Sequence, residues 1–168
     1  MYPLIIPDFI DAVTVKELYT WTIENEHLFG KYDNSFWGGR SLHSDCMPIN
    51  IKNIIASAFY SVIDIIGDKS LQPELLDITR WPPGYELHPH ADAEEPNGKQ
   101  HIYWWRKFGA IIYLNSNFTG GELYYPNLNI TVKPQPGMLA VHPGTLKYLH
   151  GVRSVVGNTR YTLTSFFK

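Results

Sequence analysis

The sequence predicts a mainly β protein, a jelly roll (double-stranded β-helix) of about eight strands braced by α-helices at its amino-terminal side. Two observations predict this fold class. Residues 11–66 hold two apolar patterns with helical spacing, whereas from Pro73 onward short apolar runs alternate with turn residues such as Pro82-Pro83-Gly84 and Gly120-Gly121. Many short strands at close, even spacing are typical of a sandwich or a barrel-like jelly roll.

Two helices are expected before the strands. The first runs from the N-cap residue Asp11 to about Glu26, and the second from about Asn50 to Ile66, where Gly67 ends it. The length of 168 residues suits one buried core and is too short for two ordinary domains. We therefore expect a single domain, with a helical support region over residues 1–72 and a jelly-roll core over residues 73–168.

The expected strands are runs of apolar or alternating residues bounded by turn signals. They are Leu75–Trp81, Glu86–Asp92, Phe108–Asn115, Glu122–Tyr125, Asn129–Lys133, Met138–His142, Gly151–Val156 and Arg160–Phe167. The sequence shows no internal repeat, so the helices are expected to cover one outer face of the sheet.

Composition excludes several classes of protein. The 14 Lys and Arg against 16 Asp and Glu leave a net charge of −2, which argues against a basic nucleic-acid clamp and a polybasic membrane anchor. The single Cys46 excludes an intramolecular disulfide framework and a Cys-rich zinc site. Met1–Leu4 lacks the basic flank of a signal peptide, and polar residues interrupt the apolar stretch Ile54–Ile66. We therefore expect a soluble, cytoplasmic protein without a membrane partner.

A metal site is predicted around His88-Pro89-His90-Ala91-Asp92. Residues i and i+2 of an extended strand point to the same side, so His90 and Asp92 can reach one ion. His150, at the start of the seventh expected strand, is the candidate third ligand. Two His and one carboxylate leave three coordination positions open, as in non-haem Fe(II) oxygenases. Arg160 follows in the last strand, where a guanidinium can bind a carboxylate through two parallel hydrogen bonds.

From about Leu75 to Phe167 the chain resembles the 2-oxoglutarate/Fe(II)-dependent dioxygenases of the prolyl-4-hydroxylase-like branch. The matching motifs, in the family's order and spacing, are His90-Ala91-Asp92, Tyr113-Leu114-Asn115, Gly120-Gly121-Glu122-Leu123, Lys133-Pro134 with Gly137, His150-Gly151-Val152 and Arg160-Tyr161-Thr162. The segment Ile6–Ile10 before the first helix also resembles the opening of that branch.

The resemblance implies an enzyme that uses Fe(II), 2-oxoglutarate and O2, with ascorbate as a supporting reductant. The residues that match the iron ligands are His90, Asp92 and His150. Arg160 matches the residue that pairs with the distal carboxylate of 2-oxoglutarate, Tyr113 matches a tyrosine that bonds the same carboxylate, and Thr162 matches a helping hydroxyl. The implied reaction hydroxylates an unactivated C–H bond and releases succinate and CO2. The implied substrate is a prolyl residue in a peptide or a proline-like small molecule.

Three features qualify this resemblance. Trp81 stands roughly where some relatives have a pocket tyrosine, and Gly109 replaces a usual Thr, so the shape of the pocket stays open. Asp92 favours hydroxylation, because related halogenases lack the carboxylate ligand. The nucleic-acid demethylating branch carries a second Arg where this chain has Phe166. The net charge of −2 also gives no excess of positive charge to attract a phosphate backbone, so no nucleic-acid partner is expected.

An alternative function is a non-catalytic or zinc-binding, cupin-like jelly-roll module. His88 lies on the same strand face as His90, so His88, His90 and His150 form a rival triad, and Glu94 stands where cupins carry a glutamate. Against this reading, the second cupin motif is missing from the sequence. His142 alternates with core residues of its strand and is expected to be an ordinary buried histidine.

The substrate is expected to meet a long loop, Ala93–Lys107, which exceeds ordinary hairpin length and is typical of a functional lid. Its candidate substrate-binding residues are Tyr103, Trp104 and Arg106, although the tryptophans would also suit a role as a barrel cap. A second candidate flap covers Phe29–Arg40. The oligomeric state stays open.

Overall fold

The computed structural model describes residues 2–30 and 40–168. The α-helices are α1 (Ala12–Glu24) and α2 (Ile49–Ile66). The strands are β1 (Leu4–Ile6), β2 (Ser41–Leu42), β3 (Asp77–Trp81), β4 (Leu87–His90), β5 (Phe108–Tyr113), β6 (Thr119–Gly120), β7 (Leu123–Tyr125), β8 (Ile130–Val132), β9 (Leu139–Pro143), β10 (His150–Val152), β11 (Val155–Val156) and β12 (Arg160–Phe167). Short 3-10 helices are η1 (Glu26–Leu28), η2 (Ser44–Cys46), η3 (Pro126–Leu128) and η4 (Leu146–Tyr148).

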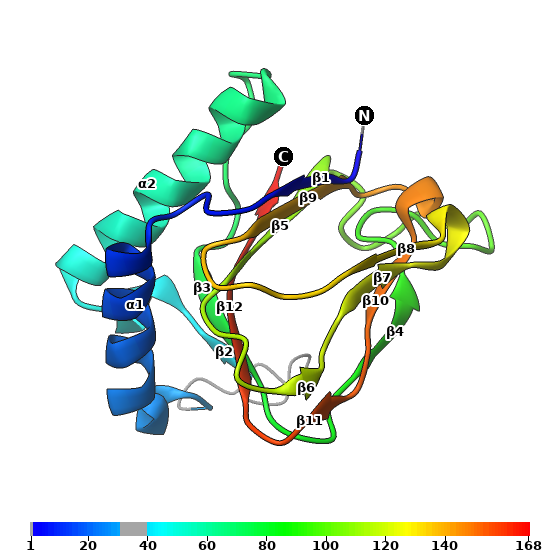
Figure 1. Ribbon diagram of the computed structural model, residues 1–168. Coiled ribbons are helices and arrows are strands. Elements are labelled where there is room, and N and C mark those ends of the chain that lie inside the picture. Colours follow the sequence, from blue (N-terminus) through cyan, green and yellow to red (C-terminus); the bar gives the residue numbers. More distant parts are fainter. Residues whose placement is uncertain (1, 31–39) are drawn as a thin grey trace.

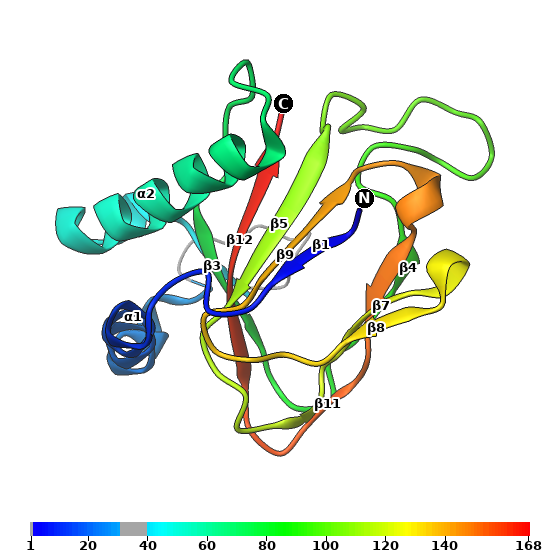
Figure 2. The same cartoon turned by 45° about the horizontal axis from the view of Figure 1, so that its top comes forward.

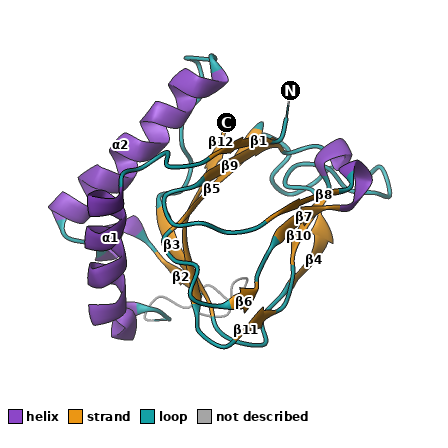
Figure 3. Ribbon diagram, viewed as in Figure 1, coloured by secondary structure: helices purple, strands orange, loops and turns teal. Residues whose placement is uncertain are grey.

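Two antiparallel sheets face each other, as expected for a jelly roll. The large sheet has six strands in the order β1-β9-β5-β12-β3-β2, and the small sheet has four in the order β4-β10-β7-β8. Figure 1 shows the two sheets with the pair β6 and β11 closing one end between them, and Figure 3 shows the same arrangement coloured by element type. Both α-helices lie on the outer side of the large sheet (Figure 2). The predicted fold class is confirmed.

Local signals account for the start of α1 and the end of α2. The Asp11 carboxylate accepts hydrogen bonds from the backbone N–H groups of Val13 and Thr14, which caps the start of α1. Gly67, at φ 82°, ends α2 in the left-handed conformation that favours glycine. α2 is the one helix of the described residues that is long and apolar enough to cross a membrane, judged by length and composition alone. Its apolar face, which includes Ile55 and Phe59, is buried in the core of this fold.

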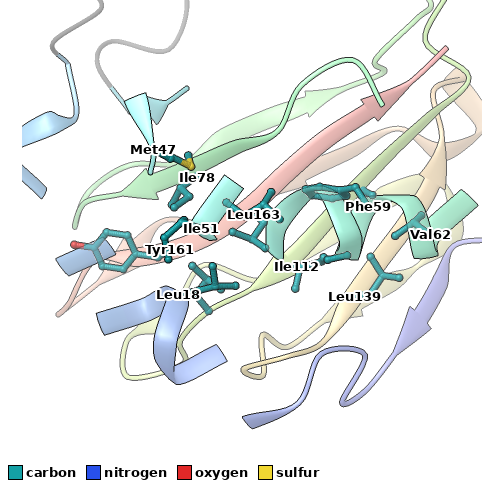
Figure 4. Packing of buried hydrophobic residues seen from close by; sticks show 14 of the residues in the cluster. Leu18, Met47, Ile51, Phe59, Val62, Ile78, Ile112, Leu139, Tyr161 and Leu163 are labelled. Carbon is teal, nitrogen blue, oxygen red and sulfur yellow. The ribbon is translucent and has the colours of Figure 1, made fainter. Parts of the chain in front are cut away.

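The main hydrophobic core fills the space between the large sheet and the helices. Leu18 of α1 and Phe59 of α2 meet Ile112, Leu139 and Leu163 from neighbouring strands of the sheet, as Figure 4 shows. A smaller apolar cluster lies between the two sheets and includes Tyr113, Tyr125 and Met138 in the described chain. The helix-side core therefore supplies most of the buried apolar surface, which is the main source of folding free energy.

Several strand predictions were wrong in their limits. β1, β2 and β6 were not expected, because strands of two or three residues are too short for a readable alternation. β1 and β2 are the edge strands of the large sheet, so residues 1–72 are not purely a helical support. The expected strand Gly151–Val156 is divided into β10 and β11, and the expected strand Glu86–Asp92 ends at His90. Asp92 therefore lies just beyond β4.

Candidate metal centre

The three predicted metal ligands meet at one end of the small sheet. His90 is the last residue of β4 and His150 the first of β10, and the two are directly paired in the antiparallel register. Figure 1 shows β4 and β10 side by side. Asp92 Oδ1 lies 3.7 Å from His90 Nε2 and 3.8 Å from His150 Nε2. The candidate ligand atoms of all three residues lie within 4.8 Å of one another, which is close enough for one ion.

The two histidine rings are oriented by the backbone. Nδ1 of His90 lies 3.1 Å from the carbonyl oxygen of His88, and Nδ1 of His150 lies 3.0 Å from that of Tyr148. Because a carbonyl oxygen only accepts, each Nδ1 carries the proton in this tautomer, and each Nε2 keeps a free lone pair. The Nε2 lone pairs of both histidines are thus available to bind a metal ion on the side of the rings that faces Asp92.

The surroundings of His150 and Asp92 favour the protonation states that metal binding requires. Burial lowers the pKa of His150 to about 3, helped by the neighbouring His142, so the ring is neutral at pH 7. Burial alone would raise the pKa of Asp92, but the electrostatic interaction with His150, the hydrogen bond from His142 and the weaker interactions with His142 and His90 outweigh it and hold that pKa below its usual value. Neutral imidazoles and an ionised carboxylate are the forms that bind a metal ion.

A cavity between the sheets connects this centre to Arg160 on β12. Its lining includes Asp92, His150, Trp81, Thr162 and Arg160. The cavity therefore joins a candidate metal centre to a buried cation.

Arg160 carries unpaired hydrogen-bond donors in this cavity. Its side chain is 1% exposed, and within the described residues its Nε and Nη2 atoms have no hydrogen-bond partner. The buried hydroxyl of Tyr113, whose ring centroid lies 5.1 Å from the guanidinium carbon, makes no hydrogen bond in the described chain either. Burial lowers the pKa of Arg160 and raises that of Tyr113. Unpaired buried donors are costly, so this pocket suits an anionic group such as a carboxylate.

Thr162 follows Arg160 on the same face of β12 and is 1% exposed. It is paired with Thr79 of β3 on one side and with Tyr113 of β5 on the other. Arg160, Tyr113 and Thr162, the predicted co-substrate residues, therefore lie on adjacent strands of the large sheet.

Sequence reasoning missed His142. The side chain was expected to be an ordinary buried histidine, but its Nε2 lies 3.2 Å from Asp92 Oδ2 and its ring centroid 4.0 Å from that of His150. Its Nδ1 lies 2.8 Å from the hydroxyl of Tyr125, whose pKa is raised by burial. The alternation of Met138, Ala140 and His142 toward the space between the sheets was the available signal. Alternation indicates the face but not the neighbours on that face.

Two of the three candidate substrate residues line a groove of about 440 Å³ beside His90. Tyr103 and Arg106 line this groove, whereas Trp104 is 60% exposed and does not. Arg106 Nε donates to Glu74 Oε2 at 2.9 Å, and its guanidinium lies 3.8 Å from the centroid of the Tyr103 ring. Arg106 is thus held by protein groups at the wall of the groove. The second candidate flap, Phe29–Arg40, lies mostly outside the described residues.

The structure does not favour the cupin-like alternative. The His88 side chain is 89% exposed and lies 3.8 Å from Glu86, outside the group of candidate ligands found in the described chain. Glu94 accepts a hydrogen bond from the backbone N–H of Leu146 at 2.6 Å. Neither residue is directed to a shared ion with His150.

Fold and site together define a jelly-roll non-haem Fe(II) oxygenase. Residues 76–168, more than half of the chain, match the family model of the 2OG-Fe(II) oxygenase superfamily. The chain belongs to this superfamily. It is therefore a dioxygenase, with Fe(II) as its metal and 2-oxoglutarate as its co-substrate. No curated protein sequence matches this chain.

Solved prolyl hydroxylase structures share this fold. The viral collagen prolyl hydroxylase of Paramecium Bursaria Chlorella virus-1, in its 2OG complex, has a TM-score of 0.74 at 16% identity over 99% of this chain and 95% of that chain. A prolyl hydroxylase from Trichoplax adhaerens, in complex with a hypoxia inducible factor peptide, has a TM-score of 0.70 at 19% identity over 98% of this chain and 82% of that chain. A Pseudomonas putida prolyl-4-hydroxylase has a TM-score of 0.67 at 19% identity over 98% of this chain and 83% of that chain. The prolyl-4-hydroxylase-like resemblance is confirmed for the fold.

Proposed function

We propose that this dioxygenase hydroxylates an unactivated C–H bond of a prolyl residue in a peptide, or of a proline-like small molecule, with release of succinate and CO2. The observation that carries the reaction is the cavity that joins the group His90, Asp92 and His150 to the guanidinium of Arg160, whose Nε and Nη2 atoms have no hydrogen-bond partner within the described residues. The prolyl substrate is supported by the fold shared with three prolyl hydroxylases.

In this proposal, His90, Asp92 and His150 hold the iron. The two imidazoles bind through Nε2 because their Nδ1 atoms are engaged with backbone carbonyls. Asp92 supplies the negative charge from a position that is 4% exposed. When bound, Fe(II) and 2-oxoglutarate supply the oxidising power with O2, and the protein orients them and keeps water away.

Arg160, Tyr113 and Thr162 bind 2-oxoglutarate in the same proposal. The distal carboxylate accepts hydrogen bonds from the two unpaired nitrogens of Arg160 and from the unpaired hydroxyl of Tyr113. Thr162, which is buried and paired with Tyr113 in the sheet register, adds a hydroxyl to the cavity wall. Each orphaned donor then gains an acceptor, which offsets the cost of its burial.

The substrate enters along the groove beside His90. Tyr103 provides an aromatic wall that the stacked Arg106 holds in place, and exposed Trp104 stands at the outer rim of the same loop. A groove of about 440 Å³ that opens at the metal centre accommodates an extended peptide or a free amino acid. We further propose that the chain works as a single cytoplasmic domain, consistent with its unpaired Cys46.

The test is turnover of 2-oxoglutarate by the iron-loaded protein with ascorbate under air. We expect succinate at a low rate without substrate, and faster succinate with equimolar hydroxyproline when a proline-containing peptide or free proline is added. Asp92→Ala, which loses the carboxylate ligand, is the matched control and should give neither product. Succinate without hydroxylated proline would contradict the substrate assignment alone. No succinate from folded, iron-loaded protein under any of these conditions would contradict the reaction itself.

A further inference from the structure

The two oxygens of the Asp92 carboxylate have different neighbours. Oδ1 faces the Nε2 atoms of His90 and His150, at 3.7 Å and 3.8 Å. Oδ2 points away from them, toward Nε2 of His142 at 3.2 Å. A carboxylate can bind a metal through one oxygen or through both. The neighbour of Oδ2 therefore affects how many coordination positions Asp92 uses.

A buried chain of hydrogen bonds determines which ring nitrogen of His142 carries the proton. Because an ionised carboxylate only accepts, the contact with Asp92 requires the proton on His142 Nε2. Nδ1 then accepts from the hydroxyl of Tyr125 at 2.8 Å. His142 is 1% exposed and Tyr125 0% exposed, so no solvent competes with this chain. The ring of His142 also lies against that of His150, with centroids 4.0 Å apart.

Gly109 leaves room for this contact. It is paired with His142 across β5 and β9. A Cβ atom at position 109 would lie 2.7 Å from Asp92 Oδ2 and 2.9 Å from His142 Nε2. Any larger residue would push into the hydrogen bond between the two side chains. The histidine therefore contacts Oδ2 of Asp92, and the glycine leaves the space that this contact needs.

We propose that His142 is a positioning residue that occupies Oδ2 of Asp92, so that this carboxylate binds iron through Oδ1 alone. This inference rests on the proposed iron ligands. Coordination through one oxygen would leave three positions open, enough for a chelating keto acid and a further small ligand. Coordination through both oxygens would take one of these three positions. Outer hydrogen-bond partners commonly orient metal ligands in this way.

The number of water molecules on the bound metal tests this role without any turnover. In protein loaded with Mn(II) and free of 2-oxoglutarate, water-proton relaxivity reports the metal-bound waters. We expect His142→Phe to lower this inner-sphere relaxivity by about a third, because one of about three waters is lost to Oδ2. The affinity of the Mn(II) protein for 2-oxoglutarate, measured by calorimetry, should fall in the same variant.

Three further variants separate positioning from packing. His142→Gln keeps an N–H donor at the same bond distance from the backbone and should retain wild-type relaxivity. Gly109→Ala should lower relaxivity as His142→Phe does, because its methyl group intrudes between Oδ2 and His142. His88→Phe makes the same kind of change at an exposed histidine of β4 and should retain wild-type relaxivity.

The outcomes are distinct. Wild-type relaxivity and wild-type 2-oxoglutarate affinity in folded His142→Phe would overturn the inference alone. If His142→Phe does not fold, Gly109→Ala decides, and wild-type relaxivity in that variant overturns the inference. Failure of the wild-type chain to bind Mn(II) would contradict the proposed metal centre and this inference with it.

Discussion

The two faces of the large sheet differ in character, although the same strands supply both. On β12, Leu163 and Phe167 are fully buried in the apolar core against the helices. Arg160 and Thr162, on the opposite face of the same strand, line the polar cavity. Successive side chains of a strand point to opposite faces, so one sequence of alternating residues builds both environments.

The difference separates stability from function. The helix-side face consists of apolar side chains that gain free energy when they leave water. The cavity face holds buried polar atoms without hydrogen-bond partners, among them atoms of Arg160, Tyr113 and Asp77 in the described chain. Such groups cost free energy in the ligand-free fold. Stability supplied by one face therefore maintains a binding site on the other.

Substitution on the helix side should produce the largest loss of stability. Leu163→Ala removes a fully buried side chain from the main core and should lower the free energy of unfolding by about 2–5 kcal/mol. The affinity of the folded, metal-loaded variant for 2-oxoglutarate should stay at the wild-type value. Urea denaturation and calorimetry measure the two quantities. A large fall in affinity with little change in stability would break the separation of the two faces.

Substitution of Arg160 should have the opposite profile. Arg160→Ala should weaken 2-oxoglutarate binding by about 2–5 kcal/mol, because a buried carboxylate loses its partner. Arg160→Lys should bind more tightly than the Ala variant, since the charge remains and only the fork geometry is lost. Binding of the metal should survive in both, because His90, Asp92 and His150 are unchanged.

The stability of ligand-free Arg160 variants sharpens the comparison. Arg160→Met replaces a buried guanidinium, two of whose nitrogens have no hydrogen-bond partner in the described chain, with a shorter, uncharged and unbranched apolar chain. We expect its Tm to equal or exceed that of the ligand-free wild type, as for other buried charges replaced by apolar groups. A Tm several degrees lower would mean that Arg160 supports the fold.

Tyr113→Phe should weaken 2-oxoglutarate binding less than Arg160→Ala does. The hydroxyl is one donor to the distal carboxylate, so its loss should weaken 2-oxoglutarate binding by about 1–2 kcal/mol. The ring remains to fill its place in the apolar cluster between the sheets. Calorimetric titration of the Mn(II)-loaded variant gives the value. Affinity equal to that of the wild type would remove Tyr113 from the binding site.

A pH-dependent effect is expected at Asp77, a buried carboxylate of the cavity face. Burial raises its pKa to about 6, opposed by His43 at 3.9 Å and assisted by Asp45. The folded state therefore holds this proton more tightly than the unfolded state, and the contribution of Asp77 to stability falls as pH rises from about 4 to about 6. Asp77→Asn removes this titration.

The measurement is urea denaturation of both proteins across this pH window. Relative to the wild type, Asp77→Asn should gain about 1–3 kcal/mol of stability between pH 4 and pH 7. A stability difference between the two proteins that does not change with pH would contradict the raised pKa.

Most of the fold could be predicted from the sequence because helix ends and turns depend on local residues. Asp11 and Gly67 mark helix ends, and turn residues separate the longer strands. β1 and β2 could not be predicted, because a strand of two or three residues exists only through its neighbour in the sheet. The end of β4 before Asp92 likewise depends on the partner strand β10, whose register shifts after His150.

The site residues that belong to a sequence motif could be predicted. A residue whose role depends on a contact with a distant part of the chain could not. His90, Asp92, His150 and Arg160 stand out through spacing and resemblance. His142 lies fifty positions from Asp92, and its hydrogen bond to that residue depends on the way β9 packs opposite the small sheet. The contact also requires a residue without a Cβ atom at position 109. The sequence shows that this residue is glycine, but it does not show which neighbouring groups occupy the space.

The most direct measurement of the central claim is an anaerobic titration of the Fe(II)-loaded protein with 2-oxoglutarate, followed by visible absorption. The account predicts a weak metal-to-ligand charge-transfer band that saturates with 2-oxoglutarate in the wild type. At the same 2-oxoglutarate concentration, the band should be much weaker in Arg160→Ala, although both proteins hold equal iron. Absence of the band from wild-type protein shown to be folded and iron-loaded would contradict the claim that this cavity brings iron and 2-oxoglutarate together.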